Sequence, residues 1–252
     1  MNFPGPHCRY LTFVSGMTFL AGIALGGDIT ILNPSFEGLT GTDTAHFDSS
    51  GHLLPGHAAL LPSVATVPSI EYATTTPVPG WVTSGGAAGT ANYTGTQYVV
   101  NGTTDGQNVG FANGFRNLHG SLSQSLGENY QVGLTYQLKV DVSSPIGLPV
   151  ADYTISLYAG NLLVASGSDS VSITPGVFST ATLSTSIDGN SAAVGQPITI
   201  VLSNSGNPPV GNQVLFDNVK LSSSVTTVPE PSTWMLAAVG LLGMVMVGRR
   251  NR

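Results

Sequence analysis

The chain has 252 residues, of which 32 are glycine and 16 are proline, and only 8% are charged. Seven basic against thirteen acidic residues give a net charge of −6, which excludes the basic footprint of a nucleic-acid-binding protein. The low charge also excludes a coiled coil, and 41% hydrophobic residues favour a folded core over a disordered charged tail. The class that remains is a secreted or surface all-β domain.

Residues 1–27 are predicted to be an export signal. Arg9 is the only positive charge there, and an apolar run over 10–25 ends beside the small residue Gly26. We expect cleavage near Gly26 or Gly27. The alternative is an N-terminal membrane anchor, but the run is shorter than the roughly 20 residues that a spanning helix needs.

The C-terminal end carries a second predicted targeting signal. Pro229, Glu230 and Pro231 precede an almost wholly apolar segment, 233–247, which is followed by the basic residues Arg249, Arg250 and Arg252. Arginines after a hydrophobic segment stay in the cytoplasm and leave the preceding domain outside. The alternative to a sorting signal here is a plain C-terminal membrane anchor.

This order of tripeptide, hydrophobic helix and basic stop resembles the PEP-CTERM sorting signal, here 229–252 after a linker at 223–228. The resemblance implies that an exosortase recognises the tripeptide and removes the tail, typically in Gram-negative bacteria that make exopolysaccharide. The C-terminal helix would hold the protein transiently in the inner membrane before it reaches the envelope, outer surface or extracellular matrix.

The middle of the chain is predicted to be β-structure. Between the two expected cleavage points, residues 27–229 contain three basic and twelve acidic residues, a net charge of −9, which should repel anionic polymers unless a divalent cation bridges them. Short segments alternate apolar and polar residues with the period of a strand, separated by turn residues. The predicted strands are 28–32, 135–142, 153–158, 178–184, 198–202 and 214–221. Together they indicate a β-sandwich at 28–222 with a long insertion at about 39–79.

Five motifs occur in an order that resembles the galactose-binding-like jelly roll of carbohydrate-binding modules. They are Asn33-Pro34-Ser35-Phe36-Glu37, Pro79-Gly80-Trp81, Leu122-Ser123-Gln124-Ser125-Leu126, Gly133-Leu134-Thr135-Tyr136 and Phe216-Asp217-Asn218-Val219. The expected fold is therefore an all-β jelly-roll sandwich, flanked by the N-terminal signal helix and the C-terminal hydrophobic helix.

In such a sandwich the first and last strands lie close together, so Glu37 and Asp217 are expected to meet at one edge. Ca²⁺ takes hard oxygen ligands, and the resemblance implies a structural calcium held by these two carboxylates and backbone carbonyls. The alternative is that both carboxylates accept hydrogen bonds from backbone N–H groups of the terminal strands.

A sugar site is expected to need an exposed aromatic ring with polar groups around it. Trp81, Tyr93 and Tyr98 are the candidates, in a region rich in Asn and Gln. The alternative for Trp81 is a place in the core, because aromatic side chains bury large areas.

Catalysis finds little support in the sequence. No Gly-x-Ser-x-Gly elbow occurs, and the histidines His46, His52 and His57 do not have the His-x-x-x-His spacing of a helical metal pair. We therefore expect a non-enzymatic exported protein that binds or supports an extracellular polysaccharide. The alternatives are a dedicated carbohydrate-binding module and, with less support, a glycan-active hydrolase with paired carboxylates.

Overall fold

The computed structural model describes residues 26–37, 78–85, 88–92, 98–115, 118–168, 171–206 and 211–225, and all the regular structure in them is β. The strands are β1 (Gly27–Ile29), β2 (Val82–Gly85), β3 (Ala88–Asn92), β4 (Asn108–Phe115), β5 (Leu118–Asn129), β6 (Leu134–Ser143), β7 (Tyr153–Ala159), β8 (Leu162–Ser168), β9 (Ser179–Ser186), β10 (Pro197–Asn204) and β11 (Asn212–Val225).

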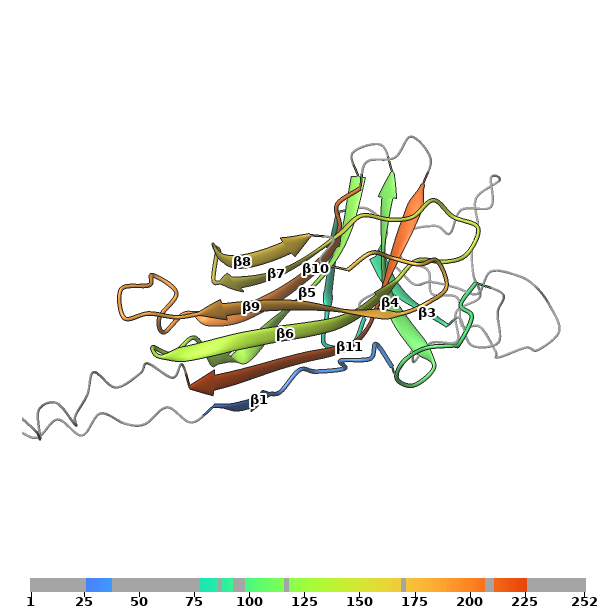
Figure 1. The fold of residues 1–252 in the computed structure, drawn as a ribbon. Coiled ribbons are helices and arrows are strands. Elements are labelled where there is room, and N and C mark those ends of the chain that lie inside the picture. The colour runs from blue at the N-terminus through green and yellow to red at the C-terminus, as the bar shows by residue number, and fades with distance from the viewer. Residues whose placement is uncertain are drawn as a thin grey trace, which may run out of the picture.

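The strands form two antiparallel layers (Figure 1). Sheet I has the order β3-β4-β11-β6-β9, with the short β1 also paired to β11. Sheet II has the order β2-β5-β10-β7-β8. The layers are continuous only through the short β4–β5 pairing, where Gly114 faces His119 and Phe115 faces Leu118. This arrangement is a jelly-roll sandwich, and the predicted fold class is confirmed.

The hydrophobic core lies between the two sheets. Leu138 and Val140 from β6 meet Ile155 from β7 and Ile200 from β10, and all four side chains are fully buried. Each such burial stabilises the fold by about 1.5–3 kcal/mol. The alternation of apolar and polar residues along β6 thus places every second side chain in the core, as the sequence predicts.

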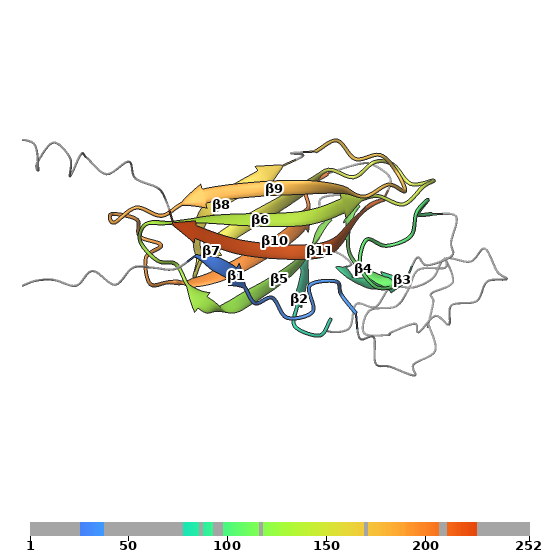
Figure 2. The same ribbon diagram turned by 60° about the horizontal axis from the view of Figure 1, so that its bottom comes forward.

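The first and last strands of the domain lie side by side, as expected from the jelly-roll resemblance. Ile29 pairs with Leu221 across β1 and β11, and Figure 2 shows the two strands together. The register between β11 and β6 shifts between Asp217 and Lys220. Asn218 has a φ of 49° at this bulge, a left-handed conformation that Asn tolerates better than most residues.

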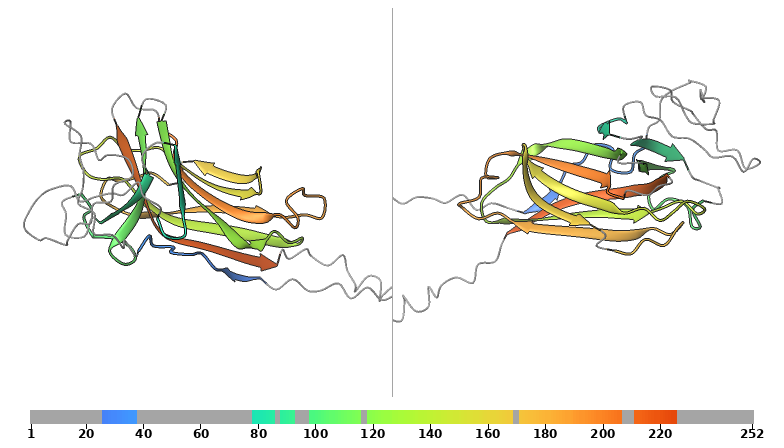
Figure 3. Two further views of the ribbon diagram at one scale, coloured as in Figure 1. Left: turned by 180° about the vertical axis from the view of Figure 1, so that it is seen from behind. Right: turned by 90° about the horizontal axis from the view of Figure 1, so that it is seen from above.

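Figure 3 shows the sandwich from behind and from above, with the yellow strands β7 and β8 beside the orange β10, as the residue pairing requires. The first predicted strand is shorter than expected, three residues instead of 28–32. The predicted signal helix, the insertion at 39–79 and the C-terminal hydrophobic helix lie largely or wholly outside the described residues. Within the described part of the chain, no helix is long and apolar enough to cross a membrane.

Candidate functional site

Glu37 holds the end of a loop that leads into β4. Its Oε1 accepts hydrogen bonds from the backbone N–H groups of Gln107 and Asn108, both at 2.7 Å, and Oε2 accepts one from Asn108 Nδ2 at 3.2 Å. Gly106 has a φ of 67°, and a Cβ there would lie 2.2 Å from Glu37 Oε1. The close approach of the carboxylate therefore requires glycine at this position.

Asp217 holds the same loop three residues earlier. Its Oδ2 accepts hydrogen bonds from Thr104 N at 2.8 Å, Thr104 Oγ1 at 2.8 Å and Asp105 N at 3.0 Å. Its Oδ1 accepts one from Asn218 N at 2.7 Å. Burial raises the pKa of Asp217 to about 6, although these hydrogen bonds act to lower it.

The junction around these carboxylates concentrates backbone strain. The non-glycine residues with positive φ in the described structure are Asn33, Phe36 and Asn218, and all three flank it. Such conformations cost about 1–3 kcal/mol each and persist only where the surroundings fix them. Ser35 Oγ adds a further tie by donating to Asp105 Oδ2 at 2.6 Å. We call residues 103–108, held by Glu37 and Asp217, the clamped loop.

Hydrogen-bond donors engage both carboxylates that the jelly-roll resemblance assigns to calcium. Every oxygen of Glu37 and Asp217 accepts at least one hydrogen bond, and the donors are N–H groups except for the hydroxyl of Thr104 at Asp217. Within the described residues, no group of three His, Cys, Asp or Glu side chains gathers, so a cation here would take the rest of its ligands from carbonyl oxygens or water. The geometry is close to the expected alternative, except that the N–H groups come mainly from the loop instead of the terminal strands.

Trp81 does not form a sugar platform, which corrects its assignment as a ligand-binding residue. Its side chain is only 3% exposed, and its ring lies 5.1 Å from that of Phe36, centroid to centroid. Its indole Nε1 donates to the Asn33 carbonyl at 2.9 Å, so the polar atom is satisfied inside the protein. Trp81 therefore stabilises the strained turn before Glu37 and presents no ring face to solvent.

The remaining predicted site residues lie elsewhere. Tyr98 is half-buried and packs against a small second cluster formed by Val109, Phe111 and their neighbours. Tyr93, the tripeptide Pro229, Glu230 and Pro231, and the basic stop Arg249, Arg250 and Arg252 all lie outside the described residues.

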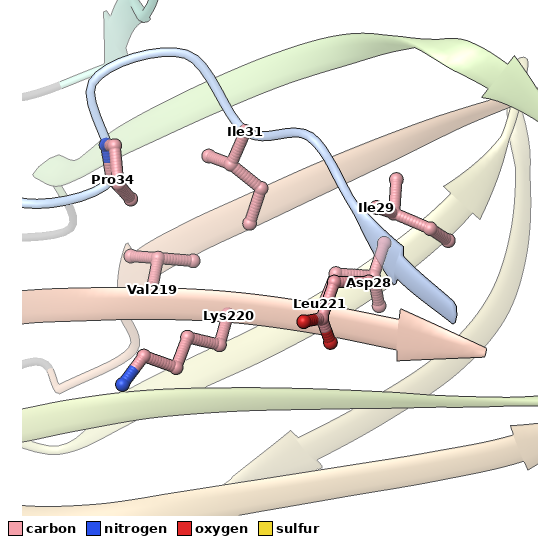
Figure 4. Close-up of a pocket in the computed structure, with 7 residues that line it drawn as sticks. All are labelled: Asp28, Ile29, Ile31, Pro34, Val219, Lys220 and Leu221. Atoms are coloured by element: carbon pink, nitrogen blue, oxygen red, sulfur yellow. The ribbon is translucent and has the colours of Figure 1, made fainter.

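A pocket of about 220 Å³ opens where the chain after β1 separates from β11 (Figure 4). Its apolar lining includes Ile31, Pro34 and Val219, and its charged residues are Asp28 and Lys220. The volume is below the range of about 300–1,000 Å³ that is usual for sites of drug-sized ligands.

The outward face of sheet II carries rows of hydroxyl groups that no sequence motif marks. One row crosses all five strands of the sheet by direct register pairing: Ser84, Ser121, Ser203, Thr154 and Ser168. The next row is Val82, Ser123, Val201, Ser156 and Ser166, in which two valines interrupt the hydroxyls and Ser156 is only 5% exposed. Neighbouring hydroxyls contact one another, as in the Thr154–Ser168 and Ser156–Ser166 pairs at 3.0 Å.

A third row adds an aromatic ring to this face. Thr199 pairs with Ser125 on one side and with Tyr158 on the other, and the Tyr158 side chain is half-exposed. Leu163 continues the row on β8. These three rows contain no charged residue, although the domain as a whole is acidic. We call them the hydroxyl face.

The fold and these surfaces define an all-β jelly-roll domain. Residues 27–222 match the family described as HpiC1-like, HpiC1 cyclase, and the chain belongs to this family. Residues 227–252 match the PEP-CTERM protein-sorting motif, which confirms the prediction made for the C-terminal end. The protein is therefore exported and processed by an exosortase, at the cell envelope or in the extracellular space. No curated protein matches the chain.

Solved structures share the fold at low sequence identity. The apo form of a cyclase from Fischerella sp. is 22% identical with a TM-score of 0.59, covering 81% of this chain and 98% of that one. A cyclase from Fischerella sp. TAU in complex with 4-(1H-indol-3-yl)butan-2-one is 20% identical with a TM-score of 0.56, covering 80% and 99%. The module TmCBM61 in complex with β-1,4-galactotriose is more distant, 15% identical with a TM-score of 0.39, covering 56% and 86%.

Proposed function

We propose that the processed protein is a non-enzymatic component of the exopolysaccharide matrix that binds neutral polysaccharide on the hydroxyl face. The observation that carries this proposal is the unbroken row of Ser and Thr side chains across the five strands of sheet II, without a charge in the three rows. Export and exosortase processing bring the domain to the compartment where such polymers accumulate.

The chemistry of the hydroxyl face matches that of a neutral glycan. Each hydroxyl both donates and accepts hydrogen bonds, as sugar hydroxyls do. Adjacent strands lie about 4.8 Å apart and successive outward residues about 6.8 Å apart, so the groups form a regular grid. Tyr158 supplies one half-exposed ring beside Thr199 on which a sugar can stack.

Binding on such a face gains its strength from repetition. A single hydrogen bond exchanged with water contributes only about 0.5–1.5 kcal/mol. A long polymer that meets several rows at once, and can rebind after local release, gains avidity without any single strong contact. A structural matrix component needs this kind of weak, repeated attachment more than it needs a tight site.

The experiment is affinity electrophoresis of the processed protein in gels that contain neutral polysaccharides. Ser203→Glu places a charge in the middle of the first row, and Tyr158→Ala removes the ring; we expect either change to reduce retardation about tenfold or more. Ser184→Glu is the matched control, because it adds the same charge to an exposed position on sheet I. Equal retardation of all four proteins would contradict the proposal.

A cyclase is the second candidate, favoured by membership of the HpiC1-like family. It predicts that a small indole ligand stabilises the native protein by mass action. The non-enzymatic proposal predicts instead that the melting temperature does not change when 4-(1H-indol-3-yl)butan-2-one, the ligand seen in the Fischerella sp. TAU cyclase, is added. A saturable rise that depends on ligand concentration would instead support a cyclase-like site.

A further inference from the structure

The two lysines of the chain lie directly opposite each other on sheet I. The whole sequence contains only Lys139 and Lys220, and they are register partners across β6 and β11. Both side chains are exposed on the outward face of the sheet, on the side of the sandwich away from the hydroxyl face. The region between the predicted cleavage points has twelve acidic and only three basic residues, and two of the basic residues thus lie side by side on adjacent strands.

This pairing is unfavourable for the isolated protein. Side chains directly opposite on antiparallel strands have Cβ atoms about 4.5–5.5 Å apart, and like charges at this spacing destabilise the sheet. Within the described residues, neither lysine forms an ion pair. Solvent screens part of the repulsion between these exposed side chains, and a bound anion would relieve the rest.

The acidic side chains near the lysines are Asp141 and Asp28. Asp141 lies two residues from Lys139 on β6, but its oxygens accept hydrogen bonds from Thr180 Oγ1 at 2.6 Å and Asn218 Nδ2 at 2.9 Å. Asp28 lines the pocket of Figure 4 together with Lys220. Asp141 is thus engaged within the sheet, whereas Asp28 remains a competitor for any bound anion.

Hydroxyl groups surround the lysine pair. Thr182 is the register partner of Lys139 on β9, and Ser222 follows Lys220 on the same face of β11. Lysine ammonium groups offer point charges with three donors each, and Ser and Thr hydroxyls can complete the coordination of an oxyanion. The patch therefore offers two charges and neutral donors within a few ångström of one another.

We propose that Lys139 and Lys220 form a binding site for the anionic groups, carboxylate or sulfate, of an acidic polysaccharide. The domain carries a net charge of −9, so long-range steering opposes such a ligand and attraction must be local to the patch. Binding at one patch is accordingly weak and sensitive to salt, and a polymer with repeated charges holds better than a single small anion. The site lies on the opposite sheet from the hydroxyl face and does not depend on it.

The test is retention of the processed protein by immobilised alginate, which carries carboxylates, and by dextran sulfate, with neutral dextran as reference. At low ionic strength we expect retention by at least one anionic polymer. Lys139→Gln and Lys220→Gln together should weaken that retention about tenfold, which corresponds to 1.4 kcal/mol. Retention by alginate alone, or by dextran sulfate alone, identifies the group that the site prefers.

Three matched measurements separate a binding site from net charge and from a structural role. Arg116→Gln removes the one other positive charge between the predicted cleavage points and should leave retention unchanged, whereas Asp28→Asn should strengthen it. The melting temperature of the double lysine variant should stay the same or rise, because the repulsion is gone. The proposal would be overturned if neither anionic polymer retained the protein, or if the double lysine variant were retained as strongly as the wild type. An equal loss of retention in Arg116→Gln would also overturn it.

Discussion

Glu37 and Asp217, near opposite ends of the domain sequence, accept hydrogen bonds from backbone N–H groups of the same short loop. Glu37 binds residues 107 and 108, and Asp217 binds residues 104 and 105. The segment after β1 and the bulge in β11 are thereby tied to one another through the clamped loop. The carboxylates act here as structural acceptors, which is the basis of the first three predictions.

Asp217→Ala is expected to destabilise the domain by about 3 kcal/mol, because it removes a fully buried carboxylate that accepts four hydrogen bonds and leaves a cavity in its place. Urea denaturation followed by circular dichroism measures the change. Asp28→Asn, at an exposed position on β1, serves as the control and should stay within about 0.5 kcal/mol of the wild type. A loss for Asp217→Ala as small as that of the control would show that the clamp contributes little.

The stability of the domain should fall as the pH rises through about 6. Burial raises the pKa of Asp217 to about 6 from an ordinary value of 3.8, so the folded state binds a proton that the unfolded state has released. Asp217 therefore stabilises the fold most when the pH is below its pKa in the unfolded state. This contribution is lost as the pH rises through its pKa in the folded state. Melting temperatures recorded between about pH 4 and pH 7 test the trend.

Asp217→Asn is the variant for this test, because it cannot titrate. Its melting temperature should vary less than that of the wild type over the same range of pH, whatever its absolute stability. If the wild-type protein became more stable as the pH rose from about 4 to about 7, the raised pKa of Asp217 would be contradicted. Stability that increases with pH in this range is expected from a carboxyl group whose pKa is lowered by folding.

Removal of divalent cations should leave the stability unchanged. Backbone and side-chain donors bind the carboxylates of Glu37 and Asp217, and the raised pKa of Asp217 lets a proton take the place of a cation in relieving the buried charge. The melting temperature in the presence of a chelator should equal that in excess calcium. A rise that grows with calcium concentration, and that Asp217→Ala abolishes, would restore the calcium site implied by the jelly-roll resemblance.

Trp81 should report the folded core and not the presence of a sugar. It is the only tryptophan between the predicted cleavage points, and its buried ring packs on Phe36. We expect its fluorescence to shift to longer wavelength on unfolding and to stay unchanged when polysaccharide binds. Trp81→Ala should cost about 3–5 kcal/mol of stability. A saturable change in fluorescence with added polysaccharide would place Trp81 at the binding site after all.

The strands with clean alternation could be predicted from the sequence, and those rich in small residues could not. Tyr136, Leu138, Val140 and Val142 give β6 an unambiguous buried face. In β4, by contrast, the ring of Phe36 fills the space beside Gly110, since a Cβ at Gly110 would lie only 2.7 Å from that ring. An apolar pattern cannot reveal a position that a distant aromatic side chain fills.

The candidate site shows the same limit. The pairing of Glu37 with Asp217 at one end of the sandwich was implied by the jelly-roll resemblance, but their partners in the loop at 104–108 carry no motif. The hydroxyl face cannot be predicted from the sequence, because Ser121, Ser203 and Thr154 form a row only through the register of their strands. Trp81 was assigned to a ligand because the sequence does not show that the Asn33 carbonyl accepts its N–H.

The most direct test of the account is to map amide chemical shifts of the processed protein by NMR while a neutral oligosaccharide is added. Binding on the hydroxyl face predicts that the amide signals of β5, β10 and β7 shift. The signals of the oligosaccharide should show no conversion to a product after long incubation. Shifts confined to the pocket between β1 and β11, or new signals from a converted sugar, would contradict it.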